Sequence, residues 1–173
     1  MLIKLCGVLF IVASTTFLGI RRADDIKEEY RQMRYLQRII CMIESEIRYA
    51  RSHLGEIFSH IAGHAKEPYK GWMISMARDM RTESEDRFED MWNREIDGYL
   101  KGAGLSENEL LGLKQLGEQL GVSDLELQIR FLELYQQQLT LHMEELREGM
   151  GIRVRLCHCL GVMSGVLIAI LFI

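Results

Sequence analysis

IKEEYRQMRYLQRIICMIESEI, residues 26–47, decides the fold of this chain. Its large apolar side chains recur at steps of three and four residues: Ile26, Tyr30, Met33, Leu36, Ile40, Ile43 and Ile47. This spacing places them on one side of an α-helix of about 25 residues. An apolar stripe must pack against another apolar surface, so we expect this helix to be one member of a bundle.

The segment before this helix, Leu2–Ile20, is apolar and carries a single charge, at Lys4. A helix needs about 20 apolar residues to cross the hydrocarbon core of a bilayer. An arginine pair, Arg21 and Arg22, follows the apolar run, and no small-residue cleavage site ends it. The pattern therefore favours a retained membrane anchor over a cleaved signal peptide. No helix-breaking residue separates the anchor from the helix that follows.

The other end of the chain, Leu156–Ile173, is apolar and uncharged, with Arg153 and Arg155 just before it. It lacks the small-residue site and polar spacer of a lipid-anchor signal. Because arginines gather on the cytoplasmic side of membrane spans, both spans place the central region in the cytoplasm and the termini outside. The sequence predicts a two-pass membrane protein with transmembrane helices in residues 1–20 and 152–173 and a cytoplasmic helical-bundle domain in residues 21–151.

Further helical stripes fill the central region, and no sustained strand-like alternation occurs. The predicted helices cover Leu54–Ile61, Trp72–Met80, Phe88–Tyr99, Ser106–Leu120 and Leu125–Met150. The clearest loop is Gly102-Ala103-Gly104, and another contains Pro68. The predicted fold is all-α: a six-helix antiparallel bundle held between N- and C-terminal transmembrane helices.

Helix boundaries are marked most clearly near the fifth and sixth predicted helices. Ser106 with Glu109 and Ser123 with Glu126 have the spacing of capping boxes. Gly121 is expected to stop the fifth helix in the left-handed conformation. Gly117 lies inside a leucine-rich helix, where glycine costs about 1 kcal/mol relative to alanine, and close approach of another helix would justify it. Gln128 is placed to bond Asp124 one turn earlier.

Composition and motifs argue against catalysis and nucleic-acid binding. The formal net charge is −4, so no basic field suggests nucleic acid. Three of the four cysteines, Cys6, Cys157 and Cys159, lie in or beside the apolar ends, which is not a disulfide framework. No glycine-rich phosphate loop or activated nucleophile occurs. The sequence therefore predicts no catalytic residue and no cofactor.

Two groups of residues resemble metal ligands at first sight. Cys157-His158-Cys159 starts an apolar segment without a second ligand pair, so we favour apolar packing, with palmitoylation of a juxtamembrane cysteine as another reading. Glu56, His60 and His64 share a helical face, but Gly63 ends that helix, so we favour a solvated surface and predict no metal. The acidic stretch at 82–90, TESEDRFED, is interpreted as a solvated face rather than a docking surface for a basic partner.

Two segments carry a family resemblance. LGEQLGVSDLELQ, residues 116–128, and IRYARSHLGEIFSHIA, residues 47–62, resemble the stage III sporulation protein AB family, and the resemblance covers essentially the whole chain. More distantly, the same segments resemble the inner-membrane platform protein F family of type II secretion and type IV pilus machines. Leu54 and Glu56 match a leucine-x-glutamate motif there, and Gly117-Glu118 with Gly121 match a second motif.

The resemblance implies a non-enzymatic membrane platform in the channel-like complex between mother cell and forespore, on the mother-cell side of the outer forespore membrane. Its implied partners are a stage III sporulation protein AA-like ATPase and other membrane proteins of the complex, and a homo-oligomer is compatible with it. The hypothesis for the partner-binding site names Gly117, Glu118, Gly121, Asp124 and Gln128. The residues alone also allow a membrane-anchored helical adaptor or regulator unrelated to secretion.

Overall fold

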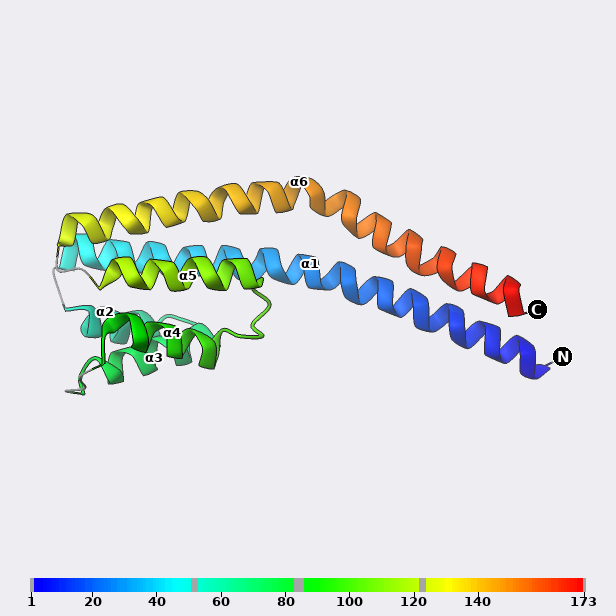
Figure 1. Cartoon of the computed structure of the whole chain (residues 1–173), viewed down its shortest axis with the longest axis horizontal. Helices are drawn as coiled ribbons and strands as arrows, with labels where there is room; N and C mark the ends of the chain where they lie inside the picture. The colour runs from blue at the N-terminus through cyan, green and yellow to red at the C-terminus, as the bar shows by residue number, and fades with distance from the viewer. Residues whose placement is uncertain (1, 51–52, 83–85, 122–123, 173) are drawn as a thin grey trace. The chain divides into compact units, whose positions relative to one another are not determined.

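The computed structural model describes the backbone of residues 2–50, 53–82, 86–121 and 124–172, and side-chain burial at 14, 17, 19–49, 53–82, 86–121, 124–152, 155, 156, 159 and 163. All secondary structure in these ranges is helical, as predicted (Figure 1). The six helices are α1 (Leu2–Ala50), α2 (Leu54–Ala62), α3 (Tyr69–Asp79), α4 (Phe88–Tyr99), α5 (Glu107–Leu120) and α6 (Leu125–Phe172).

The chain divides into two compact units. The terminal unit comprises Met1–Tyr30 and Glu144–Ile173, and the bundle unit comprises Arg31–Met143. The backbones of α1 and α6 are continuous, so the predicted run of the first helix into the apolar end of the chain is confirmed. Gly149 and Gly151 do not interrupt α6. Within the part of the chain that the structure describes, no helix carries an apolar stretch long enough to cross a bilayer.

The part of the predicted stripe that lies within the bundle unit forms one wall of its core. Met33, Leu36, Ile40, Ile43 and Ile47 are buried, together with Ile39, which extends the same face. Ile26 and Tyr30, at the start of the stripe, are half-buried. The helical period therefore identified the buried face, because side chains three and four residues apart lie above one another on a helix.

Polar bonds fix α1 and α6 as an antiparallel pair within the bundle unit. Gln37 Nε2 donates to Thr140 Oγ1 at 2.8 Å, and two turns further along α1 Gln136 Nε2 donates to Glu44 Oε2 at 2.7 Å. The pairing continues at Arg48, which bonds both Glu44 and Glu133 at 2.6 Å. As position numbers rise along α1 they fall along α6, which confirms the antiparallel arrangement for this pair (Figure 1).

Aromatic side chains join α2, α3 and α4 to one another in the core. The rings of Trp72 and Trp92 meet edge to face with centroids 4.8 Å apart. Phe58 and Phe88 lie 6.0 and 5.6 Å from Trp92, measured between ring centroids. Both tryptophans are completely buried. Edge-to-face contacts of this kind add about 0.5–1.5 kcal/mol per pair beyond area burial, so Trp92 is a central packing residue.

Candidate functional site: the corner between α5 and α6

The glycine inside α5 is explained by a close approach of α4. A Cβ atom built on Gly117 would lie 2.1 Å from Cδ1 and 2.6 Å from Cγ of Trp92. The indole Nε1 donates to the backbone oxygen of Leu113, one turn before Gly117, at 2.8 Å. Only a residue without a side chain lets the indole lie flat enough on the helix to reach that carbonyl. Sequence reasoning identified the need for a close neighbour, and the structure identifies the neighbour as Trp92.

Gln128 joins the end of α5 to the start of α6. Its side-chain amide donates to the backbone oxygen of Leu120 at 2.8 Å, and its side chain is buried. Leu120 is the last residue of α5, where carbonyl groups lack partners within the helix. The predicted side-chain bond between Gln128 and Asp124 is wrong: the bond between these residues runs from the Gln128 backbone N–H to the Asp124 backbone oxygen. The Gln128 side-chain amide instead bonds the Leu120 carbonyl, which has no partner within α5.

Asp124 caps α6. Its Oδ1 accepts from the backbone N–H groups of Glu126 at 2.9 Å and Leu127 at 3.3 Å. A carboxylate in this position satisfies helix donors and also suits the positive end of the helix dipole. Ser123, which the sequence suggested as the capping residue, lies outside the described residues. A capping box consists of two reciprocal hydrogen bonds. For the first predicted box, one of them is observed: Ser106 Oγ accepts from the Glu109 backbone N–H at 3.4 Å.

Gly121 does not adopt the predicted left-handed conformation. Its φ and ψ are −67° and −3°, and its N–H donates to the Gly117 oxygen at 3.3 Å. The helical bonding pattern therefore extends onto Gly121 instead of ending in a left-handed turn. Among the described glycines, those at positive φ are Gly102 and Gly104, both at 93°, in the loop where sequence reasoning placed the clearest turn.

Glu118 is exposed at this corner, and the structure records no ion pair between it and the residues it describes. Lys114, one turn earlier on α5, is the cation that could neutralise it locally. The Lys114 ammonium instead contacts both carboxylate oxygens of Asp97 on α4 at 2.7 Å. Of the five residues in the partner-binding hypothesis, Gly117 and Gln128 are buried in packing roles, whereas Glu118, Gly121 and Asp124 are exposed.

Two acids of the 82–90 stretch, Asp86 and Glu89, pair with arginines of the same molecule. Arg94 Nη2 contacts Asp79 at 2.8 Å, and its Nη1 contacts Asp86 at 3.1 Å. Glu89 pairs with Arg87 at 3.0 Å. The hydrogen bonds that Arg94 donates to Asp79, the larger effect, and to Asp86 raise the pKa of its guanidinium above the usual range. Residues 83–85 of the stretch lie outside the described residues.

His60 and His64, two of the three residues considered as metal ligands, make other contacts. His60 Nδ1 lies 2.8 Å from Glu46 Oε1 on α1, and the His60 and His64 rings meet edge to face at 5.3 Å. No group of three metal-ligating side chains occurs in the described portion of the chain. The side chains of Cys157 and His158 are outside that portion.

Sequence reasoning missed one ionisable pair between α5 and α6. Glu109 was interpreted as half of a capping box, but its carboxylate is buried and lies 2.8 Å from His142 Nδ1 on α6. A buried carboxylate requires a partner, because removing its charge from water is costly. The residues are 33 positions apart, so spacing along one helix could not have found the pair.

Three comparisons with known proteins point to the same family. A family model described as stage III sporulation protein AB matches residues 4–173. The stage III sporulation protein AB of Bacillus subtilis strain 168 is 26% identical over 170 residues, which cover 98% of this chain and 99% of the relative. A solved structure of a stage III sporulation protein AB superposes with a TM-score of 0.64 at 22% identity, over 72% of this chain and 97% of that one. The structural likeness shows a shared fold.

Proposed function

The chain belongs to the stage III sporulation protein AB family, and from that premise we propose that it is a non-enzymatic membrane platform of the sporulation channel complex. In this proposal the apolar ends, Leu2–Ile20 and Leu156–Ile173, anchor the chain in the outer forespore membrane. The bundle unit lies on the mother-cell side, where it meets a stage III sporulation protein AA-like ATPase. Other membrane proteins of the complex contact the anchors.

Helix continuity is the observation that carries the proposal. The helices that build the bundle, α1 and α6, are the same helices that contain the apolar ends, with no loop between the two parts of either helix. A platform must hold a partner-binding surface at a membrane, and a continuous helix connects the two without an intervening linker. The basic residues Arg21 and Arg22, and Arg153 and Arg155, support a cytoplasmic bundle.

The corner between α5 and α6 is the proposed ATPase contact. Its exposed carboxylates, Glu118 and Asp124, favour a basic partner surface. Asp124 is accounted for by its capping bonds, but Glu118 lies in the last turn of α5, where the helix dipole disfavours an acid. An uncompensated carboxylate at a mildly unfavourable place is explained by a cation on a partner.

Co-purification tests the partner. The full chain, solubilised in a mild detergent, is mixed with a tagged stage III sporulation protein AA-like ATPase, and capture of the ATPase should retain the chain in a salt-sensitive manner. An ATPase that retains none of the chain at low salt would refute the coupling role.

Fusion reporters test the topology separately. A fluorescent protein that matures only in the cytoplasm should stay dark when fused after Ile173 and should fluoresce when inserted in the loop at Gly102. Bright fluorescence from the C-terminal fusion would refute the proposed orientation.

A further inference from the structure

The outward side of α1 in the bundle unit is basic and holds no exposed acid. In the segment 31–49, which the structure describes throughout, the exposed residues are Arg31, Arg34, Arg38, Cys41, Ser45, Arg48 and Tyr49. The carboxylates of this segment, Glu44 and Glu46, are half-buried, and each is already bonded to a basic side chain. We name four exposed residues on the side of the helix opposite the buried stripe the arginine face: Arg31, Arg34, Arg38 and Tyr49.

Two cations of the arginine face are uncompensated. Arg34 and Arg38 make no ion pair with the residues that the structure describes. No acidic residue lies three or four positions from either of them, so the pairs that support a solvated helix surface are missing. The two arginines are themselves four residues apart, and like charges at that spacing destabilise a helix. An anion on a partner would remove this repulsion.

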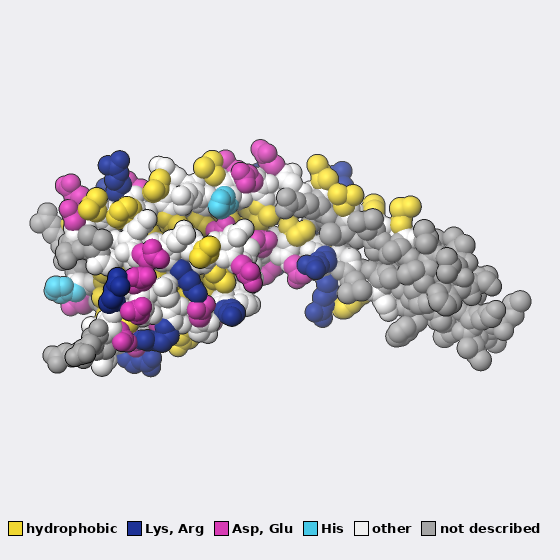
Figure 2. Space-filling model, in the orientation of Figure 1, with side chains coloured by type: hydrophobic (Ala, Val, Ile, Leu, Met, Phe, Trp, Pro, Cys, Tyr) yellow, Lys and Arg dark blue, Asp and Glu magenta, His cyan; other side chains and the backbone are white. Residues whose placement is uncertain are grey.

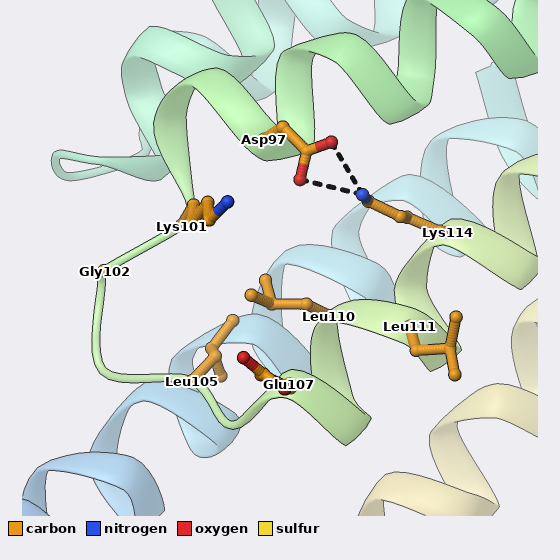
Figure 3. A pocket seen from close by; sticks show the side chains of 8 residues that line it. All are labelled: Asp97, Lys101, Gly102, Leu105, Glu107, Leu110, Leu111 and Lys114. Atoms are coloured by element: carbon orange, nitrogen blue, oxygen red, sulfur yellow. Dashed lines mark hydrogen bonds and ion pairs between the residues drawn. The ribbon is translucent and has the colours of Figure 1, made fainter.

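Other surfaces of the bundle unit carry mixed charges. Figure 2 shows acidic and basic side chains intermingled over one side of the bundle. The pocket between the end of α4 and the start of α5 is an example, because its rim holds two cations and two acids: Lys101, Lys114, Asp97 and Glu107 (Figure 3). Lys114 contacts Asp97 there at 2.7 Å. The arginine face departs from this pattern.

The composition of the arginine face favours a protein partner. Arginine and tyrosine are enriched at the centres of protein interfaces, where lysine is depleted. The side chain of Tyr49 is 81% exposed, and no lysine occurs between positions 28 and 65. The guanidinium group binds carboxylates through two parallel hydrogen bonds, which an ammonium group cannot do. The net charge of −4 disfavours a nucleic acid as the source of the anions.

We infer that the arginine face docks an acidic surface of a second protein, whose carboxylates are bound by Arg34 and Arg38 while Tyr49 packs in the same contact. The segment 31–49 spans about 27 Å of helix, so one partner surface can reach all three side chains. This partner differs from the proposed ATPase, because the corner at Glu118 favours a basic surface. The inference goes beyond the proposed function and does not depend on it.

Fluorescence anisotropy with matched probes tests the inference on the full chain in phosphatidylcholine nanodiscs. The acidic probe is a fluorescein-labelled peptide of 12 residues with six Glu among Ser and Gly. One matched probe carries Gln at the six positions, and the other is a labelled oligothymidylate with six phosphates. The Glu peptide should bind at least ten-fold more tightly than the Gln peptide and more tightly than the oligothymidylate. Equal binding of the two peptides, or tighter binding of the oligothymidylate, would overturn the inference.

Charge-reversal variants locate the binding. Arg34→Glu and Arg38→Glu should each weaken binding of the Glu peptide at least three-fold, and the double variant should weaken it at least ten-fold. The matched control, Lys101→Glu with Arg130→Glu, makes the same change of net charge at exposed positions and should alter binding less than two-fold. Because all four positions are exposed, the variants should keep the wild-type melting temperature. No loss in the double variant, or an equal loss in the control, would place the binding elsewhere and refute the inference.

Discussion

The indole ring of Trp92 occupies the space that a side chain at position 117 would need: a Cβ on Gly117 would lie 2.1 Å from Trp92 Cδ1. The same ring donates a hydrogen bond of 2.8 Å to Leu113 O. Packing and hydrogen bonding at this point therefore depend on the same glycine. The contact joins α4 to α5 at the residue just before Glu118, where we place the partner contact.

Gly117→Ala should destabilise the bundle, because the indole must move away and its hydrogen bond must lengthen. Overpacking of a core typically costs about 1–3 kcal/mol. Gly112→Ala is the matched control on the same helix: its Cβ would meet Tyr135 at 3.5 Å, an ordinary contact. Alanine there should add up to about 1 kcal/mol through helix propensity. Thermal unfolding followed by circular dichroism should show changes of opposite sign, and equal melting temperatures would contradict the close approach.

Trp92→Phe should couple to Gly117→Ala. The atoms that a Cβ at position 117 would approach are Cδ1, Cγ and Nε1 of the five-membered indole ring. Phenylalanine at position 92 removes Nε1 and its bond to Leu113. Because Gly117→Ala can no longer break that bond in this background, it should lower the free energy of unfolding by less than it does in the wild-type chain. The double-mutant cycle should yield an interaction energy of about 0.5–3 kcal/mol from chemical denaturation. Strict additivity would mean that ring and glycine do not share one site.

Gln128→Glu should destabilise the junction of α5 and α6 in a pH-dependent way. The ionised carboxylate cannot donate to Leu120 O, and its burial raises its pKa in the folded state. A folded pKa above the unfolded value means that stability is retained at low pH and lost as the pH rises. The variant should therefore approach wild-type stability near pH 4 and fall below it by about 1–3 kcal/mol near pH 7. Melting curves at the two pH values measure this, and a pH-independent deficit would contradict it.

Glu118→Lys should weaken binding to the ATPase while leaving the melting temperature nearly unchanged. The residue is exposed, and a cation in the last turn of α5 is favoured by the helix dipole by about 0.3–1 kcal/mol. Glu145→Lys makes the same charge change on an exposed position of α6 and should bind normally. Retention on the immobilised ATPase is the measurement. If Glu118→Lys binds at full strength, or loses binding only together with stability, the corner is not the interface.

The sequence determined the local features of this protein. Met33, Leu36, Ile40, Ile43 and Ile47 were predicted as a buried face because a helix repeats its faces every 3.6 residues, and these side chains are buried. The loop at Gly102 and Gly104 and the cap at Ser106 were also readable, because turn and cap chemistry involves residues only a few positions apart.

Only the tertiary structure decided which faces meet. Periodicity marks an apolar side of a helix but does not identify its neighbour, so the sequence required a close approach at Gly117 without indicating Trp92, 25 positions earlier in the chain. For the same reason the side chains of Gln128 and Glu109 were assigned to partners one turn away, whereas they bond Leu120 and His142 on other helices. The Glu109 backbone N–H does bond Ser106, as the capping box requires. A buried polar group bonds the partner that packing places beside it. Leaving that group or its partner without a hydrogen bond costs more free energy than a local hydrogen bond would provide.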